Sequence, residues 1–317
     1  MLTSFFGKSN PINYLILGVF IVAGYVLDTI LHTKIHLTPY VLLNHTAFIL
    51  VSLLSMLLLD FIIRKNHLTQ NNTYTIFFFT GFLTMLPIIF LQHKIILANF
   101  FLLLALRRLM SLRSDKNSEK KILDASIWIG VASLFYFWSL LLLAPLWIAI
   151  VQKPNSNYKQ MLVPITGLLA VVVINTAYQL LAYDDLLWFL GGKVAVGLDF
   201  SVYNSAVILV PATIILAFYI WAAMHRILKI SKLSLKEKPK HVLLLFASVT
   251  TLFIALGAPE KTGAELLFIL APIAILSANY IESPEKEAIR HKDATEFWFK
   301  EMMLWLVVLL PIIFLWL

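Results

Sequence analysis

The chain has 317 residues, of which 60% are hydrophobic and 13% are charged, so it carries too few polar residues to cover a soluble globule. The formal net charge of +8 would suit a nucleic-acid binder. The basic residues, however, fall at the ends of apolar segments, where anionic lipid headgroups attract them, and we expect no nucleic-acid partner. The chain has no cysteine, which excludes disulfides, thiolate metal sites and a cysteine nucleophile.

Eleven apolar segments follow one another along the chain. Runs such as residues 95–106 are continuously apolar, whereas the strands of a membrane barrel alternate apolar and polar residues, so all eleven segments are predicted to be helices. The sequence therefore predicts an all-α transmembrane bundle of about eleven helices, with residues 1–317 as a single integral membrane domain. The segments are residues 12–31, 41–63, 74–91, 95–110, 122–136, 138–151, 160–182, 206–228, 241–257, 264–281 and 298–317.

Lysine and arginine are concentrated in alternate breaks between these segments. If the N-terminus is cytoplasmic, the outer breaks hold only Lys34, Lys94, Lys193 and Lys261, and the remaining 21 of the 25 basic residues lie in inner breaks. Basic residues are retained on the cytoplasmic side during insertion. We therefore expect a multi-pass protein of the bacterial inner membrane with a cytoplasmic N-terminus and a periplasmic C-terminus.

Residues 122–151 form one apolar stretch that is longer than a typical span of about 20 residues. One long tilted helix or a tight hairpin of two helices would fit. The hairpin places Lys153 and Lys159 inside, whereas a single crossing would invert every later break against the charge rule. The charge pattern therefore favours the hairpin.

A few acidic residues fall on the predicted outer side, where an enzyme with a lipid-linked donor would need a carboxylate as base or metal ligand. Asp28 ends the first segment, and Asp184 and Asp185 form an adjacent pair after the seventh. These three are the candidate catalytic residues. A plainer interpretation is that Asp184 and Asp185 mark a helix end in water, and that Glu265 favours the positive end of a helix.

Other polar residues have simpler explanations. Asp60 precedes Arg64 by four residues, a spacing that predicts an ion pair on one helix face. His32 and His36 have the spacing of a metal pair, but no acidic third ligand accompanies them. The chain also has no glycine-rich phosphate loop and no GxSxG motif. We expect no metal and no cofactor.

Three stretches carry a resemblance to known proteins: KNHLTQNNTYT, LANFFLLLALRRLMSL and KKILDASIWIGVASLFYFWSLLLLAPLWIAI. They resemble an uncharacterised polytopic inner-membrane family of Bacteroidota, known only as a domain of unknown function, and the likeness covers most of the chain. The fourth segment, its basic loop and the hairpin with GVASLFYFWSLLLLAPLW are also similar to the middle of C-superfamily (GT-C) glycosyltransferases. That likeness implies a GT-C-like helical core.

Those glycosyltransferases move sugars from polyprenyl-phosphate carriers on the outer side of the membrane. Their catalytic acid usually lies in a substantial first outer loop, but the corresponding connection here, HTKIHLTPY, is short and has no Asp or Glu. Asp28 lies just before it. The chain therefore departs from these enzymes at the position where they carry their chemistry.

We accordingly expect a non-catalytic integral inner-membrane subunit of an envelope assembly, protein export or glycoconjugate complex. It would contact membrane lipids and protein partners through the outer segment 184–205 and the inner segment 282–300. Complete membrane embedding and the missing catalytic motifs both favour this interpretation.

Two alternatives stay open. An active glycosyltransferase would use a polyprenyl-phosphate-linked sugar, with Asp28 or the Asp184 and Asp185 pair as base, and Arg107 and Arg108 would hold the lipid phosphate. A transporter or lipid flippase would need a polar cavity through the bilayer. Its polar candidates within the segments are Asn175, Gln179 and Asn279.

Overall fold

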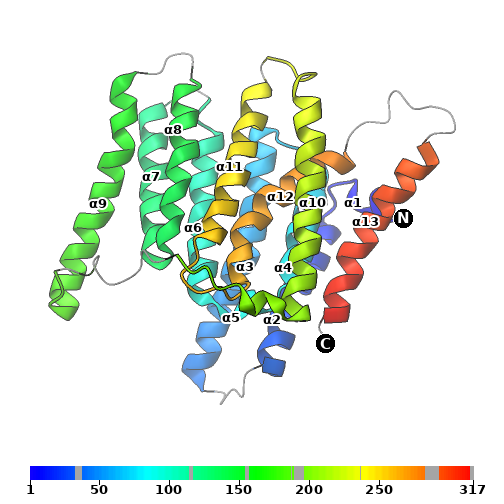
Figure 1. The fold of residues 1–317 in the computed structure, drawn as a ribbon, viewed down its shortest axis with the longest axis horizontal. Coiled ribbons are helices and arrows are strands. Elements are labelled where there is room, and N and C mark those ends of the chain that lie inside the picture. The colour runs from blue at the N-terminus through cyan, green and yellow to red at the C-terminus, as the bar shows by residue number, and fades with distance from the viewer. Residues whose placement is uncertain are drawn as a thin grey trace.

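A computed structural model describes residues 1–32, 38–113, 117–153, 157–186, 188, 196–235, 237–282 and 293–314. In that part of the chain all regular structure is helical, which confirms the all-α prediction (Figure 1). The elements are α1 (Leu2–Phe6), α2 (Pro11–His32), α3 (Pro39–Asn66), α4 (Tyr74–Thr84), α5 (Ile88–Leu91), α6 (His93–Met110), α7 (Ser118–Phe135), η1 (Phe137–Leu142), α8 (Leu143–Val151), α9 (Tyr158–Tyr183), η3 (Ser201–Asn204), α10 (Ala206–Ile230), α11 (Lys238–Leu256), η4 (Ala264–Leu266), α12 (Leu267–Ile281) and α13 (Asp293–Phe314).

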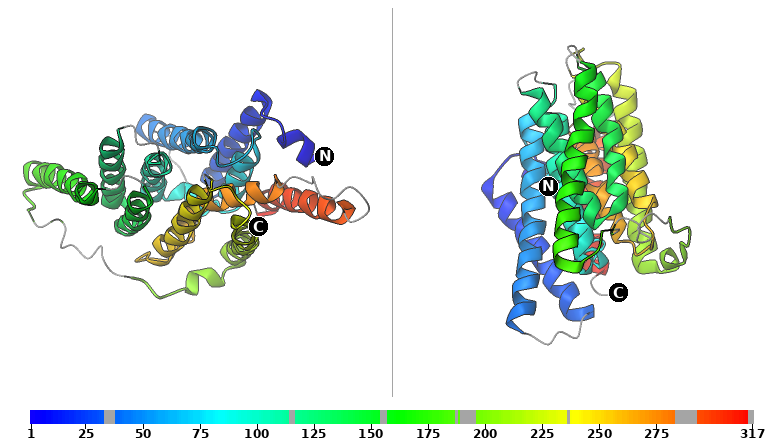
Figure 2. Two further views of the ribbon diagram at one scale, coloured as in Figure 1. Left: turned by 90° about the horizontal axis from the view of Figure 1, so that it is seen from above. Right: turned by 90° about the vertical axis from the view of Figure 1, so that its left-hand side faces the viewer.

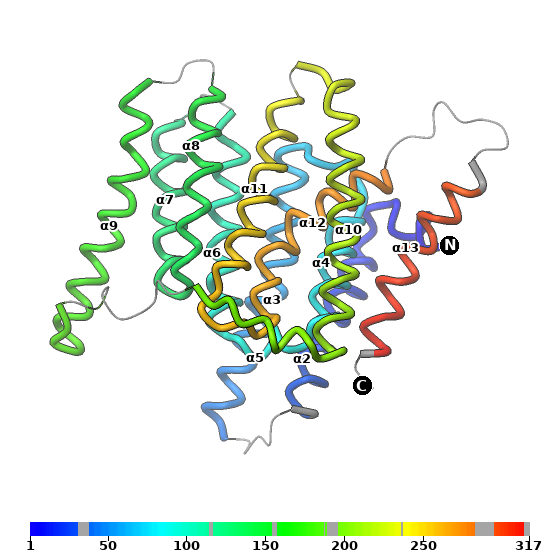
Figure 3. The backbone as a smooth tube through the Cα atoms, viewed as in Figure 1, coloured from blue at the N-terminus to red at the C-terminus, as the bar shows by residue number. Residues whose placement is uncertain are grey.

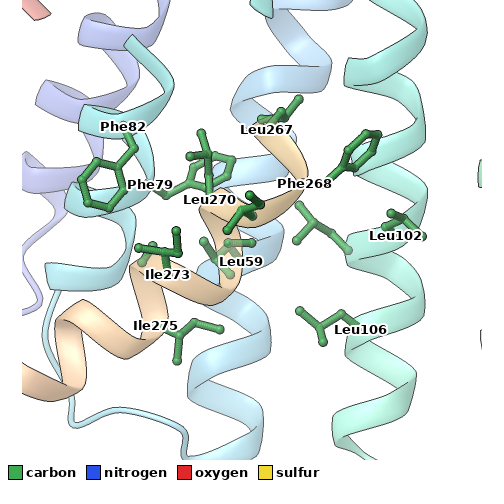
Figure 4. Close-up of a cluster of buried hydrophobic side chains, with 14 of the residues drawn as sticks. Leu59, Phe79, Phe82, Leu102, Leu106, Leu267, Phe268, Leu270, Ile273 and Ile275 are labelled. Carbon is green, nitrogen blue, oxygen red and sulfur yellow. The ribbon is translucent and has the colours of Figure 1, made fainter. Parts of the chain in front are cut away.

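Helix α12 lies at the centre of the bundle. Its sequence, LFILAPIAILSANYI, is apolar on nearly every face, and a helix of that kind must be surrounded by other helices or lipid. It packs against α4, α6, α10 and α11. In Figure 4, Phe268 and Leu270 of α12 lie among side chains of α3, α4 and α6. All its residues except Asn279 are buried.

The 122–151 stretch forms two helices joined by a corner. Helix α7 ends at Phe135, Tyr136 is extended (φ −146°, ψ 103°), and η1 then leads into α8. The Tyr136 hydroxyl donates to the carbonyl of Ile254 at 3.0 Å, which ties the corner to α11. Helix α8 returns beside α7 (Figure 3). The hairpin favoured by the charge pattern is therefore present.

Among the residues that the structure describes, six helical segments are long and apolar enough to cross a membrane, as expected of a membrane protein. They are Pro11–Ile30, Pro39–Asn66, Tyr158–Tyr183, Ala206–Ile230, Lys238–Leu256 and Ala264–Ile281. Tyr74–Thr84 and Phe137–Val151 are apolar but shorter.

Most of the described basic side chains lie at one end of the bundle. The upper end in Figure 1 holds the last residues of α3, α6, α8 and α10 and the first residues of α7, α9 and α11. We call it the basic end. Its described basic residues include Lys65, Arg107, Arg108, Arg113, Lys120, Lys121, Lys153, Lys159, Lys229, Lys232 and Lys240, whereas the opposite end carries Lys94 and Lys261 together with Asp184, Asp185, Asp199 and Glu260.

Candidate functional site

A cavity of about 690 Å³ opens at the basic end, where α3, α6, α7 and α11 meet. Its lining combines six cationic side chains with one carboxylate, that of Asp124, among the residues that the structure describes. We call this cavity the basic pocket. The cationic residues are Lys65, Arg108, Arg113, Lys120, Lys121 and Lys240.

The turn between α6 and α7 brings much of this charge together. Asn117 begins α7 in the left-handed conformation (φ 57°) that short polar side chains tolerate. Lys121 donates to the carbonyl of Ser111 at 2.9 Å, across the turn. Lys240 of α11 likewise donates to the carbonyl of His67, just after α3. These bonds fix the positions of the two ammonium groups.

Asp124 offsets one of the six cations. Its Oδ2 lies 2.7 Å from an Nη atom of Arg108, and both side chains are about one-third exposed. An ion pair this exposed contributes about 0–1 kcal/mol to stability. The pocket therefore keeps a strong positive balance, and its one described carboxylate is already engaged.

The sequence treats Arg107 and Arg108 as one candidate phosphate-binding cluster, but the structure separates them. Consecutive residues of a helix point about 100° apart. Arg108 lines the basic pocket, whereas the guanidinium of Arg107 lies 4.6 Å from the ring centroid of Phe61 in α3. Arg107 therefore packs between α6 and α3. Arg108 instead lines the basic pocket together with Lys65, Lys120 and Lys240.

A second cavity, of about 260 Å³, adjoins the basic pocket between α6, α8 and α11. The two cavities share Met110, Arg113 and Lys240. We call the second one the apolar pocket, because most of its other lining residues are apolar: Leu109, Leu112, Ala149, Leu235, Pro239 and Leu243.

Asp28 lies at the opposite end of the bundle and is 1% exposed. It follows Tyr25 by three residues on α2, and the Tyr25 hydroxyl is 2.9 Å from Nδ1 of His45 and 3.5 Å from Nε2 of His93. The ring of Phe48 stacks on His93 with centroids 3.8 Å apart. Burial and the neighbouring His45 lower the pKa of His93, which therefore stays neutral at pH 7. We call Tyr25, His45 and His93 the histidine cluster, and Asp28 lies one helical turn after Tyr25.

Sequence reasoning missed the two histidines of this cluster. His45 is in α3 and His93 begins α6, so they meet only when α2, α3 and α6 pack together. Their sequence signal was slight: each lies near the outer end of an apolar segment. His36, of the predicted metal-spaced pair, lies outside the described residues, as does the side chain of His32.

Asp184 and Asp185 form the C-terminal end of α9. Asp184 has a left-handed backbone (φ 56°), and its N–H donates to the carbonyl of Leu180 at 3.2 Å, while the N–H of Asp185 donates to that of Gln179. Both side chains are exposed. Helix α9 packs on α7 and α8 at the edge of the bundle (Figure 2), far from the α2 helix that carries Asp28. The candidate acids therefore do not share a site.

The predicted pair of Asp60 and Arg64 is confirmed. Arg64 Nε lies 2.7 Å from Asp60 Oδ2, and the Tyr14 hydroxyl donates to the same oxygen at 2.9 Å. Arg64 also donates to the Tyr14 hydroxyl. These bonds tie α3 to α2.

No curated protein and no solved structure matches the chain. The family described as a family of unknown function (DUF6427) matches residues 1–317. The chain therefore belongs to the DUF6427 family.

Proposed function

We propose that this protein is a non-catalytic integral subunit of an inner-membrane complex that serves envelope assembly, protein export or glycoconjugate synthesis. The observation that carries the proposal is the position of α9. This helix of 26 residues packs on α7 and α8 at one edge of the bundle and leaves most of its surface to the surroundings.

The exposed surface of α9 suits a helix of a partner protein. Leu181 is 89% exposed, and Tyr178 and Tyr183 are also exposed beside it. Leu198 is 80% exposed and Phe200 is also exposed, but their segment lies beside the turn after α11, where the N–H of Gly197 donates to the carbonyl of Ala258 at 3.0 Å. Aromatic residues are enriched in protein interfaces, and tyrosines are also enriched where a helix leaves the membrane. The end of α9 that carries Tyr178 and Tyr183 is therefore suited to contact a partner helix at the membrane border.

The distribution of the candidate acids supports a role without catalysis. Asp28 is buried within α2, whereas Asp184 and Asp185 follow the edge helix α9 and are exposed. Asp124 in the basic pocket pairs with Arg108. Acid–base chemistry on a transferred group requires carboxylates that converge on one bound substrate, and these four do not converge.

The proposed subunit crosses the membrane at all eleven apolar segments, with its N-terminus in the cytoplasm and its C-terminus in the periplasm. Separation of basic residues toward one end of the bundle supports this orientation, because the positive-inside rule then places the basic end in the cytoplasm. The shorter α4 reaches a spanning length only together with α5, as the apolar segment 74–91.

Affinity purification of the tagged protein from its native membrane in mild detergent tests the proposal. We expect stoichiometric protein partners by mass spectrometry, and we expect Leu181→Ser combined with Ile174→Ser, two exposed positions of α9, to release them. Leu228→Ser is the control, because Leu228 is 70% exposed on α10 near the basic end. A solitary protein, or sugar transfer by the purified protein alone, would refute the subunit role.

The histidine cluster favours one second candidate, an active transferase that uses a polyprenyl-phosphate-linked sugar. Asp28 is a buried carboxylate one helical turn after Tyr25, whose hydroxyl contacts His45 and His93, and in this candidate it would act as the general base on the outer side. In that case Asp28→Asn would abolish a glycan phenotype without lowering the protein level, and so would His93→Gln. Asp184→Asn would leave the phenotype unchanged. Equal phenotypes for Asp28→Asn and the parent protein would exclude this candidate.

A further inference from the structure

We propose that the basic pocket binds the phosphate headgroup of an anionic lipid, and that the first part of the lipid chain lies in the adjoining apolar pocket. This site does not depend on the proposed subunit role, because a solitary protein and a complex would both contain it. The residues that carry the inference are the six cations of the basic pocket and the residues that the two cavities share.

Charge is the first argument. Six cationic side chains from α3, α6, α7 and α11 and the α6–α7 turn converge on one cavity whose described lining includes a single carboxylate. Brought together in the folded protein, such charges repel one another unless an anion lies between them. Backbone carbonyls hold the ammonium groups of Lys121 and Lys240 at the cavity. A phosphate supplies both the negative charge and several acceptor oxygens.

Shape is the second argument. The positive-inside rule explains basic residues at a helix end, but it does not require them to line a common concave space. The basic pocket has a volume of about 690 Å³, within the range of about 300–1,000 Å³ typical of ligand pockets. It is therefore large enough for a phosphate headgroup, and its walls belong to four different helices.

The neighbouring cavity selects a lipid over free phosphate. Arg113 and Lys240 border both cavities, and beyond them the apolar pocket presents Leu109, Leu112 and Leu243. A ligand that fills both spaces needs an anionic head joined to an apolar chain. Both pockets lie at the basic end, and cationic pockets between membrane helices on the cytoplasmic side are suited to phosphate headgroups.

The test measures binding of dioctanoyl phosphatidylglycerol to the purified full-length protein in detergent, with dioctanoyl phosphatidylcholine and inorganic phosphate as comparison ligands. We expect saturable binding of the phosphatidylglycerol that weakens with salt. Replacing Arg113 and Lys120 together by alanine should weaken it about 30-fold, since each basic residue near an anionic lipid surface contributes about a factor of five. The matched control replaces Lys159 and Lys232, exposed lysines of the basic end outside the pocket, and should change binding little.

A second variant keeps the test decisive if the alanine pair fails to fold. Asp124→Asn removes the one described carboxylate from the pocket and releases Arg108, so it should tighten binding several-fold. Damage to the fold cannot produce a gain of that kind. The proposal is overturned if phosphatidylcholine binds equally well or if the control lysines matter as much as Arg113 and Lys120. Equal competition by inorganic phosphate at matched concentration would assign the pocket to a free anion and would overturn the lipid assignment.

Discussion

Asp60 holds the first part of α2 against the last part of α3. Its Oδ2 accepts hydrogen bonds from Arg64 and Tyr14, and the Asp60 side chain is mostly buried. Asp60→Asn keeps the shape of the side chain but removes the charge that balances Arg64. We expect a loss of about 1–3 kcal/mol in the free energy of unfolding, because a partly buried guanidinium loses its charged partner. Denaturant unfolding in detergent measures this loss.

Glu237→Gln provides the control for that substitution. Glu237 also faces a basic residue, Lys240, but at 3.9 Å and with its own side chain half exposed. An exposed pair contributes about 0–1 kcal/mol, so the control should unfold close to the parent protein. Equal losses for the two variants would show that Asp60 acts no differently from a surface charge.

Single residues show where sequence reasoning succeeds and where it stops. The Asp60 and Arg64 pair follows from spacing within one helix. Glu265 lies in the first turn at a helix start, as expected: it accepts from the N–H of Thr262 at 3.1 Å and also from the Tyr203 hydroxyl at 2.9 Å. By contrast, His45 and His93 meet through tertiary packing between distant segments, which spacing along the chain cannot reveal.

At the scale of helices, α4 and α13 approach closely because Gly81 has no side chain. A Cβ atom at Gly81 would lie 2.1 Å from Cγ1 of Val307 and 3.2 Å from its carbonyl oxygen. Small residues allow such approaches in membrane bundles. Gly81→Ala should therefore destabilise the protein by about 1–3 kcal/mol through overpacking, measured as a lower midpoint of thermal unfolding in detergent.

Gly18 on α2 offers a matched comparison for Gly81. A Cβ there would meet only Cδ2 of Leu53, at 3.6 Å, an ordinary contact. Alanine is a better helix former than glycine by about 1 kcal/mol, so Gly18→Ala should be neutral or stabilising. Adding Val307→Ala to Gly81→Ala should recover part of the loss. If the double variant is no more stable than Gly81→Ala, the close contact with Val307 is not the cause.

Apolar runs predicted the helices well but not their breaks or their neighbours. The segment 74–91 appears as α4 and α5 because Pro87 lacks an N–H and disfavours a continuous helix. For residues 122–151 the apolar pattern allows either one long helix or a hairpin, and the positions of Lys153 and Lys159 favour the hairpin that turns at Tyr136. The central position of α12 and the edge position of α9 depend on contacts between helices, and both segments are simply apolar in the sequence.

For the whole molecule, the orientation in the membrane can be tested directly because the chain has no cysteine. Ser201 and Ser234 are both exposed and flank the 25-residue helix α10, whose length of about 38 Å exceeds the hydrocarbon core of a bilayer. Ser201→Cys and Ser234→Cys therefore place single thiols on opposite sides of the membrane with little change in side-chain size.

A membrane-impermeant maleimide then separates the two orientations. We expect it to label Ser201→Cys in right-side-out vesicles and Ser234→Cys in inverted vesicles, since the basic residues near Ser234 are retained in the cytoplasm. The reverse pattern would invert the proposed topology and move the basic pocket to the periplasmic side. Labelling of both thiols from one side would show that α10 does not cross the bilayer. The expected pattern would instead place the basic pocket beside the cytoplasmic leaflet, whose anionic lipids are the ligands that its charge requires.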